Sequence, residues 1–188
     1  MMFERFTQDA RAVVKGAVEH CERSGSRTVD AEHMLLALID RGAGRGSFAL
    51  AELGLAERGE SVARALEEAR RRAGLSQTEA EALAGLGIDV SEIVARAEEV
   101  HGVGAMSGGR KDKGRRGGHR SFSRGARDVL ERSLRIAVAR RDRRIGDEHI
   151  LLALTARPGV AAEVLADHGV THESVTRVLH GGGGTKAG

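Results

Sequence analysis

The stretch Glu-His-Met-Leu-Leu-Ala-Leu-Ile, at residues 32–39, occurs twice in this sequence. The second copy, Glu-His-Ile-Leu-Leu-Ala-Leu-Thr at residues 148–155, agrees with it at six of eight positions and begins 116 residues later. Each copy has a charged start followed by a run of apolar residues, which is typical of a helix that enters a hydrophobic core. The recurrence predicts that the chain contains two copies of one helical unit.

The likeness between the two units extends beyond this stretch in both directions. Upstream, at the same offset, Phe6-Thr7 corresponds to Phe122-Ser123. Downstream, residues 60–66 correspond to residues 173–179 after small changes of length. The predicted segments are a first repeat (1–73), a helical insert with a glycine-rich basic linker (74–118), a second repeat (119–180) and a flexible tail (181–188).

Apolar residues recur three and four positions apart through most of both repeats, which predicts amphipathic helices. The expected helices are 7–24, 30–41, 47–53 and 60–73 in the first repeat, and 123–140, 147–156, 160–168 and 172–180 in the second. In the insert we expect a helix that starts near Ser76 and another over residues 92–100 with Ser91 as its N-cap. No segment alternates cleanly between apolar and polar residues, so no strand is expected. The prediction is an all-α fold, with two pseudo-symmetric four-helix repeats packed as one domain.

Composition restricts the kind of protein this is. The net charge is only +3, and residues 110–118 hold five basic side chains and one acid, so the basicity belongs to the insert. The longest apolar run has six residues, whereas a membrane-spanning helix needs about 20. The N-terminus has no signal-peptide pattern, and the single cysteine, Cys21, allows no internal disulfide. A cytoplasmic protein is expected.

The order of these motifs resembles the double Clp-N repeat, the N-terminal domain of the Clp unfoldases of the AAA-plus class. The marks are Phe-Glu-Arg-Phe-Thr at residues 3–7, both Glu-His-x-Leu-Leu-Ala-Leu stretches, and the Phe-Ser start of the second unit. The N-domain of actinobacterial ClpC is the nearest in pattern. No P-loop of the form Gly-Lys-Ser/Thr is present, so we expect a stand-alone relative without ATPase modules. No cofactor and no enzymatic activity are expected.

The resemblance implies a non-enzymatic, chaperone-related module of the Clp proteolysis system that binds protein substrates, adaptors or degrons. Its partners would be Clp unfoldase and protease components. One alternative is a decoy that captures cyclic-peptide antibiotics directed at the ClpC N-terminal domain. Another is a weak nucleic-acid binder that uses the basic insert through a few salt-sensitive phosphate contacts. A solvated linker is the simpler interpretation of that insert.

The family resemblance further implies one phosphoarginine site in each repeat. A carboxylate would accept guanidinium N–H groups, while a hydroxyl, backbone N–H groups and a cation hold the phosphate. By position, the first site would use Glu32, Thr7 and Arg5. The second would use Glu148 and Ser123. The alternative is that both glutamates only complement the positive end of a helix dipole.

The two implied sites differ in charge. In the second repeat Asp147 adds a negative charge beside the implied phosphate position. Ser121 stands opposite Arg5, so no cation is aligned there unless Arg120 or Arg124 replaces it. We therefore expect the first site to be the stronger one.

Two phenylalanines have two possible roles. Phe3 and Phe122 either pack between the repeats or, as the resemblance implies, line a hydrophobic ligand patch. His33 and His149 lack the spacing of metal ligands, so no metal is expected and a hydrogen-bonding role is favoured. Cys21 lies on the apolar face of its predicted helix and is expected to be a small core residue.

Overall fold

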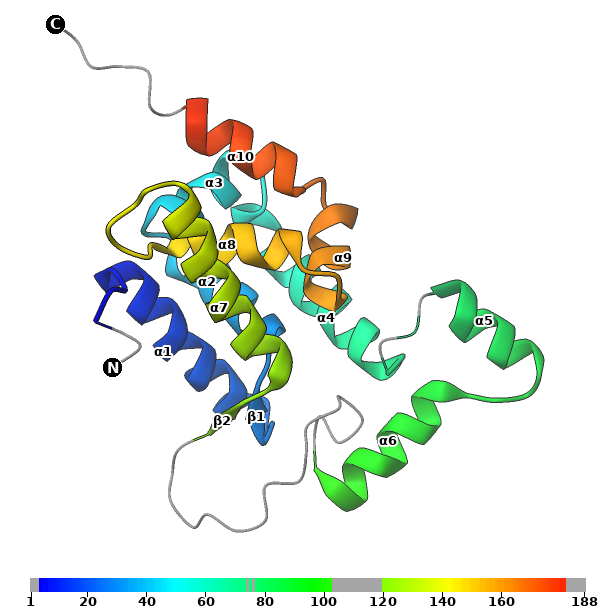
Figure 1. The fold of residues 1–188 in the computed structure, drawn as a ribbon. Helices are drawn as coiled ribbons and strands as arrows, with labels where there is room; N and C mark the ends of the chain where they lie inside the picture. Colours follow the sequence, from blue (N-terminus) through cyan, green and yellow to red (C-terminus); the bar gives the residue numbers. More distant parts are fainter. Residues whose placement is uncertain (1–3, 74, 76, 103–119, 182–188) are drawn as a thin grey trace, which may run out of the picture.

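The structure is a computed structural model of the 188-residue chain and describes residues 4–73, 75, 77–102 and 120–181. Over these residues the chain is helical, which confirms the predicted all-α class (Figure 1). The first repeat contains α1 (Gln8–Arg23), α2 (Ala31–Arg41), α3 (Arg45–Glu52), the 3-10 turn η1 (Ala56–Arg58) and α4 (Gly59–Arg71). The insert contains α5 (Gln77–Gly85) and α6 (Val90–His101). The second repeat contains α7 (Arg124–Ala139), α8 (Asp147–Ala156), α9 (Val160–Asp167) and α10 (His172–Gly181).

The helix starts follow local capping chemistry. The Thr7 hydroxyl accepts the N–H of Ala10 at 3.1 Å, and the Ser123 hydroxyl accepts the N–H of Ala126 at 3.1 Å, so α1 and α7 begin in the same way. One predicted cap is wrong. The N-cap of α6 is Asp89, not Ser91, because the helix starts earlier than expected.

The two repeats are interlocked rather than merely adjacent. Helix α1 packs on α2 as α7 packs on α8, and α3 contacts α8 as α9 contacts α2. Through α3 and α9, each repeat therefore packs on the second helix of the other (Figure 1). Helix α4 also contacts α9, and α10 contacts α3. One continuous hydrophobic core therefore includes residues of both repeats.

A short parallel ladder joins the repeats at the start of α2. It consists of β1 (Thr28–Val29) and β2 (Ser121–Phe122), and the Ser123 N–H donates to the Val29 carbonyl at 3.0 Å. The expectation of no strand is wrong for these residues. Each strand is only two residues long and its partner is remote in the sequence, so neither could show an alternating pattern.

A second, pseudo-symmetric pairing lies at the start of α8. Phe6 bridges Ile145, and the Thr7 N–H donates to the Ile145 carbonyl at 2.9 Å. The start of each repeat is thus held against the residues that precede the second helix of the other repeat.

The two second helices are not equally buried. Helix α8 is buried from Asp147 to Leu154, and Leu152 is only 1% exposed. Leu36, its counterpart on α2, is only partly buried against the core. The two leucines are therefore equivalent in sequence but not in burial, because α8 has more of the bundle packed around it (Figure 1).

The insert helices extend to one side of the bundle (Figure 1). Helix α6 packs on α4 through Val94, which is 1% exposed, and through an ion pair between Arg70 and Glu98. Ile93 and Val100, also on α6, are 49% and 74% exposed. The predicted linker and tail lie almost entirely outside the described residues.

In the part of the chain that the structure describes, no single helix is long and apolar enough to cross a membrane. Helices α8 and α9 meet that criterion only as a pair, by length and composition, and they are bent by 94° at the break between them.

Candidate functional site

The pairings between the repeats decide which of the predicted site residues meet. Arg5 and Thr7 lie beside Ile145, since the Ile145 N–H donates to the Arg5 carbonyl at 2.8 Å. Ile145 is three residues before Glu148. The structure therefore places Arg5 and Thr7 near the start of α8, and not with Glu32 as expected from their shared repeat.

The converse holds at the start of α2. Ser123, from the second repeat, pairs with Val29 and lies beside Asp30 and Glu32. We call Asp30, Glu32 and Ser123 the α2 site. We call Arg5, Thr7, Asp147 and Glu148 the α8 site. Each site combines residues of both repeats.

In the α8 site the Asp147 carboxylate is already bound. It accepts the backbone N–H groups of Arg45 at 3.1 Å, Gly46 at 2.9 Å and Ser47 at 3.3 Å, and Asp147 is 2% exposed. These N–H groups belong to the first turn of α3 and have no intrahelical partners. From the sequence, Asp147 was expected to repel a bound phosphate. It instead caps α3 of the other repeat, because its carboxylate accepts the N–H groups of the first turn of that helix.

The second carboxylate of the α8 site is also engaged. The Arg45 Nη1 donates to Glu148 Oε1 at 3.3 Å, and the Glu148 side chain is 9% exposed. It lies over Gly146, where any Cβ would clash with the carboxylate. Burial raises the pKa of Asp147, and the adjacent charge of Glu148 raises it further, while the N–H groups of α3 act in the opposite direction.

In the α2 site the Glu32 carboxylate is unoccupied. It forms no hydrogen bond or ion pair with any of the residues that the structure describes. Burial raises the pKa of Glu32 to about 7, and the charge of Asp30 adds to the increase. The cations Arg70 and Arg157 lower it. Glu32 is thus a poorly solvated acid that two guanidinium groups compensate only incompletely.

The rest of the α2 site holds Asp30 in place. Burial raises the pKa of Asp30, while a hydrogen bond with the Ser123 side chain lowers it. The Asp30 N–H donates to His33 Nδ1 at 2.9 Å. Because the Ser123 hydroxyl also caps α7, it acts mainly as a fixed neighbour of Asp30.

The difference between the sites has a simple cause in the sequence. Ala31 stands in the first repeat where Asp147 stands in the second, and Asp30 stands where Gly146 stands. Helix α9 is the counterpart of α3, and both have a glycine as N-cap, but among the described residues only α3 has a carboxylate, that of Asp147, on the N–H groups of its first turn. In the α8 site both carboxylates therefore have protein partners, whereas in the α2 site Glu32 has none among the described residues.

The two histidines have the structural role that was predicted. Nδ1 of His149 accepts the Gly146 N–H at 2.9 Å, as His33 does for Asp30, and Nε2 of His149 lies 2.9 Å from Asp142 Oδ2. Burial lowers the pKa of His33 to about 4. No group of three or more potential metal ligands occurs among the described residues.

The remaining predicted residues give a mixed result. Cys21 is fully buried, as expected for a core residue, and its thiol donates to the carbonyls of Ser26 and Thr28. Phe122 is partly buried against the core. Phe3 lies outside the described residues, so the hydrophobic ligand patch stays a prediction.

Three arginines that the sequence analysis did not select act on these carboxylates: Arg45, Arg70 and Arg157. Arg157 could have been found from the sequence, because Arg41 stands at the equivalent position of the first repeat, at the end of α2. Arg45 had none, because its contact with Glu148 depends on how α3 packs on the other repeat.

Comparison with known proteins defines the class to which this fold and these sites belong. The chain matches the family described as Clp repeat (R) N-terminal domain over residues 5–103 and 121–183. It therefore belongs to the Clp repeat N-terminal domain family, as the resemblance implied.

Individual relatives are larger proteins. The chain is 31% identical over 172 residues to the negative regulator of genetic competence ClpC/MecB of Bacillus subtilis (strain 168), which covers 91% of this chain and 16% of that protein. It is 31% identical over 172 residues to the chaperone protein ClpB of Oceanobacillus iheyensis, with the same coverage. It is 29% identical over 180 residues to the chloroplastic chaperone protein ClpC1 of Arabidopsis thaliana, covering 95% of this chain and 15% of that protein. The chain thus spans about a sixth of the length of these relatives.

Proposed function

We propose that this chain is a peptide-recognition module of a cytoplasmic Clp system and that it binds phosphoarginine at the α2 site. The observation that carries the proposal is Glu32, a half-buried carboxylate that has no hydrogen bond or ion pair among the described residues, and whose pKa is raised by burial to about 7. The chain would present bound substrates, adaptors or degrons to Clp unfoldase and protease components.

A guanidinium ligand would match the carboxylates of this site. A cation beside Glu32 would stabilise the charged carboxylate that burial and Asp30 disfavour. A planar guanidinium can donate two parallel N–H groups to one carboxylate, which adds strength and orientation. Asp30 offers a second acceptor within the same site.

A phosphate on that guanidinium also has support. Arg70 and Arg157 provide positive charge close to Glu32. No side chain of the described residues accepts a hydrogen bond from the first turn of α9, while the equivalent first turn of α3 binds the Asp147 carboxylate. The α8 site thus contains an internal example of an anion bound at the equivalent helix start, which favours a ligand that carries both a cation and an anion.

Calorimetry on the wild-type chain tests the proposal with three ligands: free phosphoarginine, arginine and inorganic phosphate. Phosphoarginine should bind most tightly, because neither of the other ligands can satisfy both Glu32 and the nearby cations. Absence of measurable heat with millimolar phosphoarginine would refute the proposal.

No described contact favours either alternative function. The decoy hypothesis depends on Phe3 and Phe122, of which Phe122 is partly buried against the core and Phe3 lies outside the described residues. The nucleic-acid hypothesis depends on residues 110–116, which also lie outside them. A cyclic peptide and a short single-stranded oligonucleotide, titrated under the same conditions, serve as the corresponding comparisons.

A further inference from the structure

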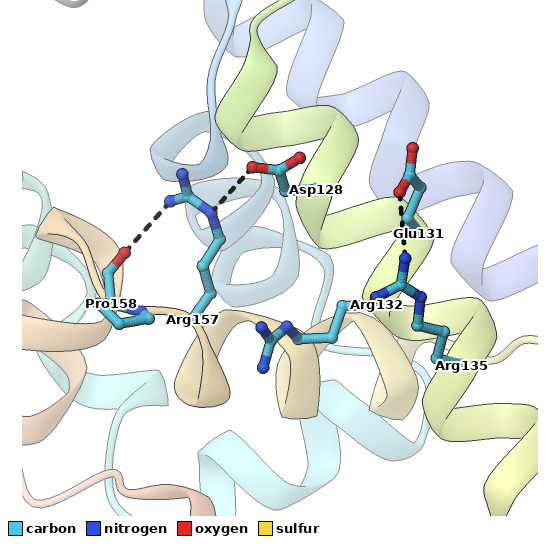
Figure 2. Close-up of a pocket in the computed structure, with 6 residues that line it drawn as sticks. All are labelled: Asp128, Glu131, Arg132, Arg135, Arg157 and Pro158. Carbon is cyan, nitrogen blue, oxygen red and sulfur yellow. Dashed lines mark hydrogen bonds and ion pairs between the residues drawn. The ribbon is translucent and has the colours of Figure 1, made fainter.

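A depression of about 390 Å³ lies between α7 and the segment that joins α8 to α9 (Figure 2). Its lining is almost entirely charged, and it consists of Asp128, Glu131, Arg132, Arg135, Arg157 and Pro158. We call it the arginine pocket. Residues 12, 15, 16, 19, 41 and 42, at the equivalent positions of the first repeat, include no matching set of arginines, so the pocket is specific to the second repeat.

The guanidinium groups of this pocket are only partly used. Arg132 Nη1 donates to the Ala156 carbonyl at 3.2 Å, and Arg157 Nη1 donates to the Pro158 carbonyl at 3.4 Å. The carboxylates are more distant, since Asp128 lies 3.7 Å from Arg157 and Glu131 lies 3.7 Å from Arg135. Each arginine has five N–H donors, so most of the donors remain available to a ligand.

Arg157 connects the pocket to the α2 site. It lines the pocket, and its charge also lowers the pKa of Glu32. Helix α9, which begins three residues after Arg157, contacts α2, so the arginine pocket and the α2 site lie on neighbouring elements.

We propose that the arginine pocket binds the carboxylate side chains of an acidic peptide segment. The inference rests on the proposed function and extends it, because it defines the ligand as a peptide in which phosphoarginine lies a few residues from Asp or Glu. Carboxylates suit this pocket because arginine can bind them through two N–H groups at once.

Several features favour a peptide over a nucleic acid. Three arginines and two acids give the lining a net charge of only +1. A continuous phosphate backbone would meet the carboxylates of Asp128 and Glu131 as well as the guanidinium groups. A depression of this size can instead take one or two acidic side chains and leave the rest of the peptide outside.

The test compares two phosphoarginine peptides that differ only in flanking residues, Glu-Glu in one and Ser-Ser in the other. The informative variant is Arg135→Gln, because its one ion pair is the loose contact with Glu131 and its side chain is 80% exposed. The matched control is Arg177→Gln, whose side chain is 74% exposed and pairs with Glu173 at the same spacing on α10. A third probe, a Glu-rich peptide without arginine, reports on the pocket alone.

Fluorescence anisotropy should show that the wild type binds the Glu-Glu peptide roughly fivefold or more tightly than the Ser-Ser peptide. Arg135→Gln should abolish that difference and weaken the Glu-rich probe, while Arg177→Gln should change neither. An unaltered preference in Arg135→Gln, or an equal loss for both peptides, would overturn the inference.

The probes also separate this inference from the proposed function. If neither phosphoarginine peptide binds but the Glu-rich probe still binds and depends on Arg135, the proposed function fails and the acidic-peptide pocket stands. If a single-stranded oligonucleotide binds more tightly than the Glu-rich probe and depends on Arg135, the assignment to a peptide is wrong.

Discussion

The carboxylate of Asp147, at the start of α8, accepts the backbone N–H of Gly46, at the start of α3, at 2.9 Å. This bond crosses between the two repeats and brings two helix starts into direct contact. A Cβ at Gly46 would lie only 2.8 Å from the backbone of Asp147, so the sequence keeps a glycine at the closest approach. One buried side chain thus joins the repeats and also closes the α8 site.

Asp147→Ala should destabilise the protein by about 1–3 kcal/mol, because it leaves three N–H groups of α3, two of them buried, without their acceptor. Urea denaturation at pH 7 measures the free energy of unfolding. The exposed control Asp167→Ala should change it by less than about 0.5 kcal/mol. Equal effects for both variants would mean that the contact between α3 and α8 adds nothing to stability.

Leu152→Ala should destabilise by about 2–5 kcal/mol, since the residue is 1% exposed in the centre of the bundle. Leu36→Ala should cost clearly less, because Leu36 is only partly buried. Matched urea curves for the two variants measure the difference. A Leu36→Ala loss as large as that of Leu152→Ala would show that α2 is buried as deeply as α8.

The helices were largely predictable because they depend on local signals. Apolar periodicity and capping residues together placed the ten helices of the described residues close to their observed positions, and Thr7 caps α1 as expected. The exceptions have specific causes. Helix α3 begins at Arg45, two residues earlier than expected, because its cap is Asp147 of the other repeat.

The composition of the sites was harder to predict because it depends on contacts between the repeats. Position within a repeat suggested that Thr7 belongs with Glu32. The exchanged pairings of Phe6 with Ile145 and of Val29 with Phe122 bring residues of opposite repeats together instead. That the Glu32 site binds phosphoarginine more tightly than the Glu148 site stays a prediction, but its reason has changed. The carboxylates at the other site are already occupied.

Glu32→Gln should stabilise the protein at high pH. The pKa of Glu32 is raised from its ordinary value of 4.5 to about 7 in the fold, so the folded state holds this proton more tightly than the unfolded state. The contribution of Glu32 to stability therefore falls as the pH rises from about 4.5 to about 7 and stays unfavourable above that range.

At pH 8 the Gln variant should be more stable than the wild type by about 1–3 kcal/mol, and at pH 4 the gain should vanish. Thermal or urea denaturation at both pH values measures this. The exposed Glu163→Gln variant is the control and should show no such pH-dependent gain. A Gln variant that is less stable at pH 8 would mean that Glu32 is already well compensated in the fold.

Phosphoarginine binding should release protons. Near pH 7 about half of the Glu32 side chains carry a proton, and a bound guanidinium favours the charged carboxylate. Calorimetry in two buffers of different ionisation enthalpy measures the number released, which should be about half a proton at pH 7 and close to zero at pH 9. The release should persist in Glu148→Gln. Proton uptake at pH 7 would contradict the assignment of Glu32 as the acceptor.

The most direct measurement is a calorimetric titration of phosphoarginine into Glu32→Gln and Glu148→Gln, side by side with the wild type. A single lost charge-assisted hydrogen bond is worth about 1.5–3 kcal/mol, so Glu32→Gln should weaken binding at least about tenfold. Glu148→Gln should bind nearly as well as the wild type, because Arg45 already occupies the Glu148 carboxylate. The account is contradicted if Glu148→Gln loses the binding and Glu32→Gln retains it.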